Sequence, residues 1–272
     1  MKIAVIGHTG MGGKAIAEAL VERGHEVTGL SRHPESVPSR KGLKSVALDL
    51  FDAAGLRETL RGQDAVISAF AAGHSHTPEP NIFYRQVEGT RRIIKAFKEA
   101  EAGYLMYIGG VSSLYVRPGV KMLDDDRFPQ WYFGTAPAAF LRWLGSITGQ
   151  QVFTDSAVRR EQGKLGPDEL DPAVSEFVKS APVPPLIEGC RVALDLFEGR
   201  SDFSWSFLSP PWLYRPGPGS GTYHLGIDYM PFGNGRPLGI NVPDFALAVV
   251  DAVEKKAFVH KHWTVSGPQN DA

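Results

Sequence analysis

The chain of 272 residues contains a single cysteine, Cys190, which excludes an intramolecular disulfide and a cysteine-based metal site. It also lacks an apolar run approaching the roughly 18 residues of a membrane-spanning helix. Neither sign of charge dominates, because 29 basic residues stand against 30 acidic ones, so nothing points to nucleic acid or an anionic membrane. Met1 leads directly into an apolar strand pattern without a charged segment and a long apolar run, so we expect no signal peptide. We therefore expect a cytoplasmic protein that binds no nucleic acid, membrane or metal.

Apolar residues make up 43% of the chain and alternate between two periodicities, those of strands and of helices. Short apolar runs predict strands at 2–6, 26–30, 44–48, 65–70, 104–108, 203–208 and 262–265. Helical spacing predicts helices at 14–23, 56–60, 82–101, 138–149, 186–198 and 242–255. This alternation predicts an α/β fold of the Rossmann type, a doubly wound parallel sheet with strand order 3-2-1-4-5 onward.

The regular alternation breaks between about residues 121 and 185. We interpret the whole chain, 1–272, as one domain of this Rossmann type with an inserted, mainly helical lobe there and a small C-terminal region on the substrate side. A long irregular insert in a compact domain is usually functional or disordered. The apolar face of the helix predicted at 138–149 could cover the substrate, the main body or a second subunit, which leaves a homodimer open.

The loop GHTGMGGKA connects the first strand to the first helix, the place where a phosphate is bound in α/β proteins. It does not fit a nucleoside triphosphate loop, because Lys14 falls one place late and Ala15 has no hydroxyl for magnesium. Gly7, Gly10 and Gly13 instead form G-x-x-G-x-x-G, a variant of the dinucleotide fingerprint. A glycine-rich turn without a ligand is the alternative.

The second predicted strand ends in Ser31 and Arg32, where an NAD site usually carries an acidic residue for the ribose hydroxyl. An acid would repel a 2′-phosphate, whereas Arg32 can pair with it through two hydrogen bonds. The sequence therefore predicts NADP(H) in preference to NAD(H), unless Arg32 is merely a solvated surface side chain.

The segments GHTGMGG, SRHP, ALDLFD, AVISAF and YIGGVSSLYVRPG resemble the atypical short-chain dehydrogenase/reductase group, which includes NmrA-like and NADH-flavin reductase-like proteins. The later FSWSFLSPPWLYRPGPGSGTY and VPDFALAVVDAVE are similar to that group as well. The resemblance covers about 1–119 and 186–268 but not the segment between them.

The resemblance implies a cofactor path along the carboxyl ends of the strands. Asp49 and Leu50 would border the adenine, Ala69–Ala71 would pass under the cofactor, and Ile108–Gly109 would lie near the nicotinamide ribose. Leu208–Pro210 would face the nicotinamide. The full predicted cofactor set is Gly7, His8, Thr9, Gly10, Met11, Gly12, Gly13, Ser31, Arg32, Asp49, Leu50, Ala69, Phe70, Ala71, Ile108, Gly109, Leu208, Ser209 and Pro210.

The Tyr-x-x-x-Lys pair that usually moves the proton in short-chain dehydrogenases is absent after the fifth predicted strand. Ser112, Ser113 and Tyr115 are substitute catalytic candidates, although the two serines could equally cap a turn. The favoured function is an NADPH-dependent oxidoreductase that passes hydride to a small organic or flavin/quinone-like substrate. A non-catalytic NADP(H)-sensing regulator of the NmrA-like type is the alternative, and a nucleotide-sugar epimerase or dehydratase is a third possibility.

Two further polar groups have plainer interpretations than metal binding. His74 and His76 follow the fourth predicted strand, and we expect a polar loop there because no further ligands are evident nearby. Asp124–Asp126 could attract a hard cation, but we expect a solvated turn.

Overall fold

The computed structural model describes residues 1–73 and 81–269. The described residues form two compact units. The first holds residues 1–114 and the described residues from 185 onwards, and the second holds Tyr115–Pro184. The predicted insert began at about 121, but the second unit already begins with the hairpin of β6 (Tyr115–Arg117) and β7 (Val120–Lys121), which the sequence analysis did not foresee.

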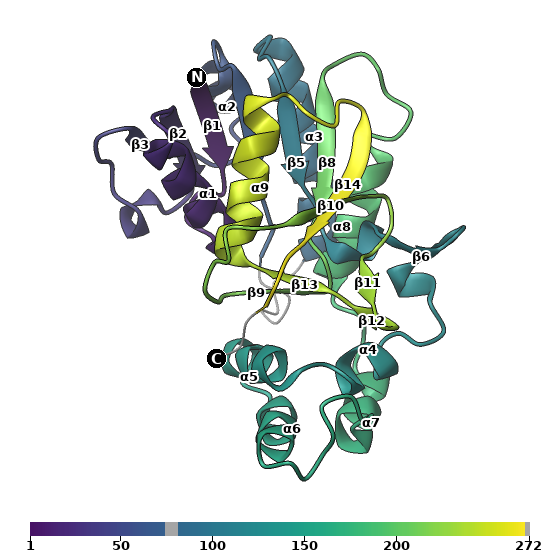
Figure 1. Cartoon of the computed structure of the whole chain (residues 1–272). Helices are drawn as coiled ribbons and strands as arrows, with labels where there is room; N and C mark the ends of the chain where they lie inside the picture. Colours follow the sequence, from purple (N-terminus) through teal and green to yellow (C-terminus); the bar gives the residue numbers. More distant parts are fainter. Residues whose placement is uncertain (74–80, 270–272) are drawn as a thin grey trace. The chain divides into compact units, whose positions relative to one another are not determined.

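The first unit is built on an eight-stranded sheet (Figure 1). Its order is β10-β14-β8-β5-β4-β1-β2-β3, and every neighbouring pair is parallel except β10 with β14. The strands are β1 (Lys2–Ile6), β2 (Glu26–Ser31), β3 (Leu43–Ala47), β4 (Ala65–Ser68), β5 (Leu105–Ile108), β8 (Trp205–Ser209), β10 (His224–Ile227) and β14 (Lys261–Ser266). The predicted Rossmann-type sheet and its order 3-2-1-4-5 are confirmed.

Helices cover both faces of this sheet. They are α1 (Met11–Glu22), α2 (Ala53–Leu60), α3 (Ile82–Glu99), α8 (Pro185–Asp195) and α9 (Val242–Glu254). Along β1, Ile3 and Val5 pack into the core with α1 and α9, whereas Ala4 and Ile6 pack into the core with α2, α3 and α8. Because side chains alternate along a strand, a central strand between two helical layers must be apolar at every position, as KIAVI nearly is.

Smaller elements complete the first unit. β9 (Leu213–Arg215) pairs in parallel with β13 (Gly239–Asn241), and β11 (Phe232–Gly233) pairs with β12 (Arg236–Pro237). Two short 3₁₀ turns, Pro34–Ser36 and Val111–Ser113, follow β2 and β5. None of these short strands was predicted, because two or three residues carry too little periodicity to reveal a strand.

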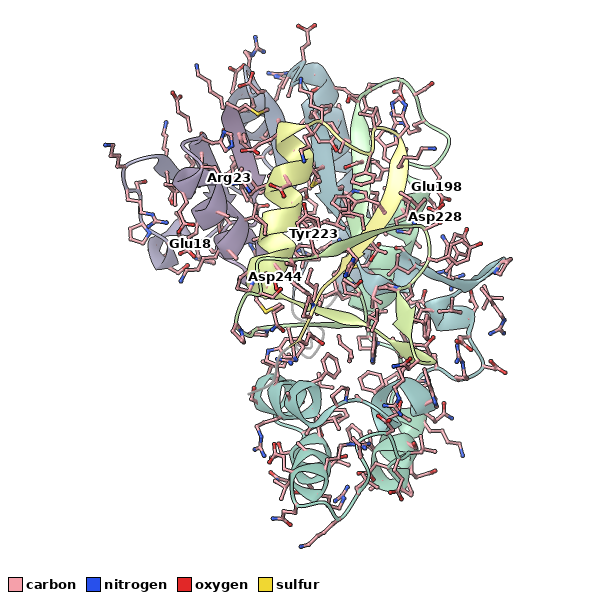
Figure 2. The ribbon with its side chains drawn as sticks, in the orientation of Figure 1. Glu18, Arg23, Glu198, Tyr223, Asp228 and Asp244 are labelled. Carbon is pink, nitrogen blue, oxygen red and sulfur yellow. The ribbon has the colours of Figure 1, made fainter. Side chains whose placement is uncertain are left out.

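Side-chain ion pairs join the C-terminal ends of α1 and α9, the two helices that cover the same face of the sheet. Arg23, just after α1, contacts Asp251 (2.6 Å) and Glu254 (2.8 Å) of α9, and the Tyr223 hydroxyl donates to Asp251 (2.6 Å). Figure 2 shows Arg23 and Tyr223 beside α9. These groups are partly exposed, so we assign them a role in orienting α9 rather than much stability.

The second unit is mainly helical, with a short 3₁₀ turn at Met122–Asp124. Its helices are α4 (Gln130–Gly134), α5 (Ala138–Thr148), α6 (Gln151–Glu161) and α7 (Pro172–Ser180). α7 begins where proline at its first position and Asp171 as N-cap predict a start, because the Asp171 carboxylate accepts the Ala173 N–H at 3.0 Å. The buried Arg160 guanidinium donates to the carbonyls of Gly134 and Glu169, which joins α6 to the segments before and after it.

Candidate functional site

The glycine-rich loop runs from β1 into α1 and leaves the helix N-terminus open. Gly7 has φ +79°, and Gly10 is the N-cap of α1 without any side-chain capping bond. The first helical bond joins the Lys14 N–H to the Gly10 carbonyl (2.9 Å), so the preceding N–H groups have no intrahelical acceptor. The helix starts at Met11, three residues before the predicted start, which places Gly12 and Gly13 in its first turn. An anion is favoured at such an end.

This loop lines a pocket of about 360 Å³ at the carboxyl ends of β1, β2 and β4. Ten predicted cofactor residues line it: Gly7, Thr9, Gly10, Ser31, Arg32, Asp49, Leu50, Ala69, Phe70 and Ala71. Residues not predicted also line it: Ile6, Leu30, His33, Ser36, Leu48, Phe51, Ala72, Gly73 and Arg85. Ligands of open parallel sheets bind at this edge, so we call this pocket the carboxyl-edge pocket and take it as the candidate site.

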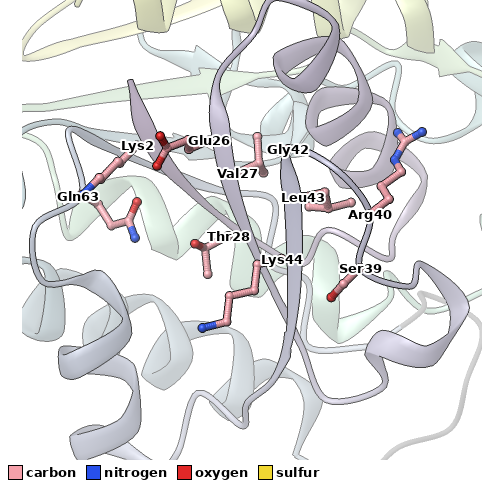
Figure 3. A pocket seen from close by; sticks show the side chains of 10 residues that line it. All are labelled: Lys2, Glu26, Val27, Thr28, Ser39, Arg40, Gly42, Leu43, Lys44 and Gln63. Carbon is pink, nitrogen blue, oxygen red and sulfur yellow. The ribbon is translucent and has the colours of Figure 1, made fainter.

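A pocket of similar volume lies at the opposite, amino edge of the sheet. Figure 3 shows its lining, which comes from the starts of β1, β2 and β3 and from the segment before β3. Lys2, Glu26 and Lys44 alternate in charge around it. It includes none of the glycine-rich loop, so it lacks the helix N-terminus that holds a phosphate.

Arg32 follows β2 and lines the carboxyl-edge pocket with an exposed side chain. Within residues 1–73 and 81–269 the structure gives its guanidinium no carboxylate partner. Ser31 precedes it, and the Ser31 hydroxyl lies 2.9 Å from the Thr9 hydroxyl of the glycine-rich loop. The end of β2 therefore presents a free cation and hydroxyls, and no acid.

Arg85 is a second cation in the same pocket, and the sequence analysis missed it. It lies in the first turn of α3, with its guanidinium 5.6 Å from the centre of the Phe51 ring, which also lines the pocket. Arg92 also contacts this ring (4.7 Å) but is bound to Glu88 and to the Phe51 carbonyl. The position of Arg85 in the first turn of a helix gave no sign that this residue would reach a pocket formed by the loops after β1, β2, β3 and β4.

The loop after β4 is fixed from α3. The buried Gln86 side chain accepts the Ala72 N–H (2.9 Å) and donates to the Tyr107 hydroxyl (3.1 Å). The Phe70 ring lies against Gly89, where an added Cβ would stand 2.4 Å from it. The Phe70 side chain is therefore packed on α3, and the loop backbone is held in place at the pocket.

Four predicted residues of the glycine-rich loop do not line the pocket: His8, Met11, Gly12 and Gly13. His8 is fully buried and lies near Gly29 and Ser45. Gly12 faces the Tyr214 hydroxyl, and Gly13 lies against Gly7. These contacts give His8, Gly12 and Gly13 packing roles in the loop, while Met11 is exposed.

The residues predicted near the nicotinamide meet at the ends of β5 and β8. Ile108 pairs with Leu208, and the Gly109 N–H donates to the Leu208 carbonyl (2.8 Å). The buried Ser209 hydroxyl lies 3.0 Å from Nε2 of His262. These residues, with Pro210, lie at the same edge of the sheet as the carboxyl-edge pocket but are not part of its lining. Their contact with a cofactor stays a prediction.

The three catalytic candidates are divided between the two units. Ser112 and Ser113 are buried, and their hydroxyls donate to the carbonyls of Ile187 (2.9 Å) and Cys190 (3.2 Å) in α8. Tyr115 belongs to the second unit. The serines thus hold the turn after β5 on α8, and a catalytic role for all three residues remains a prediction.

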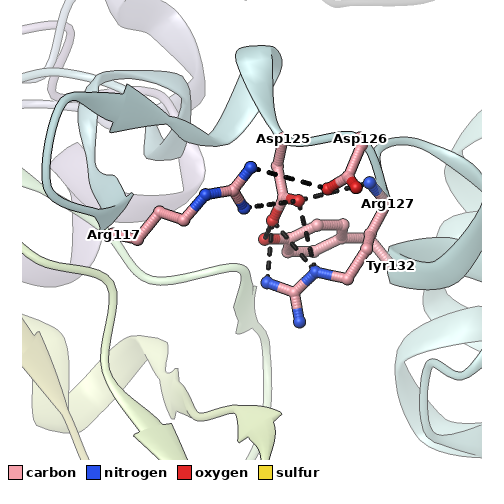
Figure 4. Close-up of polar contacts among 5 residues, drawn as sticks. All are labelled: Arg117, Asp125, Asp126, Arg127 and Tyr132. Carbon is pink, nitrogen blue, oxygen red and sulfur yellow. Dashed lines mark hydrogen bonds and ion pairs between the residues drawn. The ribbon is translucent and has the colours of Figure 1, made fainter.

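In the acidic run of the second unit, Asp124 and Asp126 are exposed, as expected for a solvated turn, but Asp125 is not. The Asp125 carboxylate is buried and accepts bonds from Arg127, from Arg117 (3.3 Å) and from the Tyr132 hydroxyl (2.9 Å), as Figure 4 shows. Burial disfavours the ionised carboxylate, but the bonds from Arg127 and Tyr132 outweigh it and hold the pKa of Asp125 below its usual range. Only tertiary packing could reveal that the two arginines converge on Asp125.

Across the described ranges 1–73 and 81–269, no group of three or more His, Cys, Asp or Glu side chains is arranged to hold a metal. His74 and His76 lie outside these ranges. None of the described helices is long and apolar enough to cross a membrane.

Comparisons with known proteins agree with this geometry. Residues 7–137 match the NAD(P)H-binding family. The uncharacterized protein YwnB of Bacillus subtilis (strain 168) is 25% identical over 268 residues, which cover 97% of this chain and 98% of YwnB. A 3-beta-hydroxysteroid dehydrogenase of Mycolicibacterium neoaurum is 25% identical over 273 residues, covering 94% of this chain and 71% of that protein.

Solved structures share the fold over nearly the whole chain. A "putative NADH-flavin reductase" from Streptococcus pneumoniae TIGR4 superimposes with a TM-score of 0.68 at 24% identity, covering 98% of this chain and 100% of the other. Residues 7–137 are thus similar to the NAD(P)H-binding family, the chain shares its fold with the solved Rossmann-type structure, and the predicted resemblance to proteins of this kind is confirmed.

Proposed function

We propose that this protein is an NADPH-dependent oxidoreductase that passes hydride to a small organic or flavin/quinone-like acceptor. The observation that carries the proposal is the pair formed by the open α1 N-terminus and the unpaired Arg32 in one pocket. The N-terminus of α1 suits a pyrophosphate, and Arg32 suits a phosphate on the adenosine ribose. The match of residues 7–137 to the NAD(P)H-binding family supports the cofactor class.

The residues present fit a dinucleotide in the carboxyl-edge pocket. Gly10 lines the pocket, and a Cβ there would meet only the Gly7 oxygen at 3.4 Å, so the glycine leaves space for close approach of a phosphate. The N–H groups at the start of α1 would hold the pyrophosphate, and Arg32 would hold the 2′-phosphate. Arg85 and Phe51 would enclose the adenosine side. When bound, the reduced nicotinamide supplies the hydride.

The acceptor class follows from the lack of a dedicated proton donor. The chain has no Tyr-x-x-x-Lys pair after β5, and the Ser112 and Ser113 hydroxyl protons are donated to α8. Hydride transfer to an electrophilic flavin or quinone needs less acid catalysis than transfer to a simple carbonyl, because the anion that forms is a weaker base and can take its proton from solvent. Alignment of the two rings can then suffice. The name of the structurally similar reductase from Streptococcus pneumoniae supports this choice.

The same missing proton donor favours a second candidate function, a regulator that senses NADP(H) without turnover. The two functions differ in turnover and in discrimination between reduced and oxidised cofactor. A regulator would bind a protein partner, whereas the oxidoreductase has a small-molecule substrate. We expect a protein of the cytoplasm in either case, and a homodimer remains open.

The test is a paired titration of the purified chain with NADPH and NADH by calorimetry, followed by NADPH consumption with flavin mononucleotide and with a soluble quinone. We expect NADPH to bind about 10- to 100-fold more tightly, the size of one charge-assisted contact to phosphate. Arg32→Ala should remove that preference, while Arg40→Ala, an arginine that lines the amino-edge pocket, should retain it. Equal binding of both cofactors would overturn the NADPH assignment. NADPH binding without consumption of either acceptor would favour the regulator.

A further inference from the structure

We infer that His8 is a positioning residue that sets the selectivity for NADPH, acting through Ser45 on the loop that carries Arg32. The inference rests on the proposed function, because it concerns the same pocket. It assigns a role to a buried histidine that does not line the pocket and that no step of the proposed chemistry uses.

The position of His8 is built into the sheet. Its side chain is fully buried, and its ring covers Gly29 in the middle of β2. A Cβ on Gly29 would stand 2.5 Å from two carbon atoms of the ring, so β2 accommodates the imidazole only because residue 29 is glycine. The ring is therefore held between the glycine-rich loop and the two outer strands.

A chain of hydrogen bonds runs from His8 to the loop between β2 and β3. Nε2 of His8 lies 3.1 Å from the Ser45 hydroxyl, and that hydroxyl donates to the Val37 carbonyl at 2.5 Å. Because a hydroxyl has one proton, Nε2 must be the donor to Ser45. The Ser45 N–H in turn donates to the Ser39 hydroxyl (2.8 Å). Ser45 thus fixes residues 37 and 39 relative to His8.

Thr9, the next residue of the glycine-rich loop, holds the start of the loop between β2 and β3. The Thr9 hydroxyl lies 2.9 Å from the Ser31 hydroxyl, and the Ser31 oxygen accepts the His33 N–H at 3.2 Å. Arg32 stands between these two anchors, exposed and without a protein anion among the described residues. Consecutive residues of the phosphate-binding loop therefore hold both ends of the segment that carries the unpaired cation.

This arrangement predicts that loss of the Ser45 bonds weakens binding of the ribose 2′-phosphate but not binding of the pyrophosphate. The pyrophosphate would meet the α1 N-terminus, which does not depend on the Ser45 bonds, whereas the ribose phosphate would meet Arg32, whose loop does. A loop that is ordered before binding loses less conformational freedom when the phosphate arrives. Loss of the His8–Ser45 hydrogen bond should weaken the binding of NADPH and leave the binding of NADH unchanged.

The experiment measures the ratio of dissociation constants, NADH over NADPH, by calorimetry in the full chain. We expect Ser45→Ala to lower the ratio about fivefold, the size of one neutral hydrogen bond, with NADH binding changed less than twofold. His8→Ala should lower the ratio in the same direction. His8→Gln, whose amide can donate at the place of Nε2, should keep the ratio. Ser146→Ala is the matched control, because its hydroxyl likewise donates to a backbone carbonyl, that of Trp143, but in the second unit.

The outcomes separate this inference from the function on which it rests. If Arg32→Ala lowers the ratio and Ser45→Ala does not, the inference is overturned and the proposed function stands. If Arg32→Ala leaves the ratio unchanged, the proposed preference for NADPH fails and the inference fails with it. Equal weakening of both cofactors by Ser45→Ala would show a merely structural role and would also overturn the inference. Should His8→Ala not fold, Ser45→Ala carries the test.

Discussion

The carbonyl oxygen of Gly7 occupies the place where a side chain at Gly13 would begin. A Cβ built on Gly13 would stand 2.1 Å from that oxygen and 3.1 Å from the Cα of His8. The start of α1 can therefore lie on the glycine-rich loop only because residue 13 is glycine. Gly13 belongs to the predicted dinucleotide fingerprint, and the structure identifies the backbone that it contacts.

Gly13→Ala should lower both stability and cofactor binding, because the contacting atoms are backbone and cannot turn away. We expect a loss of about 1–3 kcal/mol in the free energy of unfolding, measured by urea denaturation, together with weaker binding of NADPH. Gly10→Ala is the matched variant: its φ of −75° suits alanine, and its Cβ would make only ordinary contact within the protein. Gly10→Ala should fold normally and still weaken cofactor binding, since its methyl group would enter the pocket.

Arg85→Ala should weaken the binding of NADPH and the binding of NADH to the same extent. The guanidinium lies near the Phe51 ring in the carboxyl-edge pocket, so we expect it to contact the adenosine, which both cofactors share. A cation–π contact at an exposed site corresponds to a loss of about two- to fivefold in affinity. Calorimetry with both cofactors measures it. A loss confined to NADPH would instead make Arg85 a second ligand of the ribose phosphate.

Ser112→Ala and Ser113→Ala should each lower the free energy of unfolding by about 1 kcal/mol, because each leaves a carbonyl of α8 without its hydroxyl donor. The rate of NADPH consumption should change little. Tyr115→Phe in the second unit is the companion variant for the third catalytic candidate. A tenfold fall in kcat with unchanged cofactor binding in any of the three would establish a catalytic role for that residue.

Asp125→Asn should destabilise the second unit at neutral pH and make its stability less dependent on pH. The pKa of Asp125 is lowered by folding, so the ionised carboxylate stabilises the fold above its unfolded pKa of about 3.9, and this contribution is lost as pH falls through the lower folded value. We expect Asp125→Asn to lower the free energy of unfolding by about 2 kcal/mol at pH 7, measured by urea denaturation.

The control for this change is Asp126→Asn. The Asp126 side chain is 83% exposed and lies 3.7 Å from Arg117, so its removal should change stability little at either pH. A difference between wild type and Asp125→Asn that persisted undiminished at pH 2 would contradict an ionic role for Asp125.

The sequence predicted the sheet and the glycine-rich loop between β1 and α1 because both depend on local patterns. KIAVI is apolar at successive positions, and the three glycines stand between a strand and a helix. Ten of the predicted cofactor residues line one pocket for the same reason, since the loops after β1, β2, β3 and β4 must meet at one edge of a parallel sheet. The strands of two or three residues were missed because so few residues have no measurable periodicity. β10 and the helices α4, α6 and α7 were not predicted either, and α1 begins three residues before its predicted start.

The fold class, the strand order and the expected class of ligand could be derived from the sequence, since they follow from periodicity and from glycines at fixed spacing. Tertiary structure alone decided which side chains face the pocket and which support it. His8 lies in the predicted loop yet is buried on Gly29, and Arg85 lies 36 residues beyond Asp49 yet shares its pocket. The two arginines that neutralise Asp125 converge for the same reason. Such contacts depend on packing between separate segments, which no local pattern specifies.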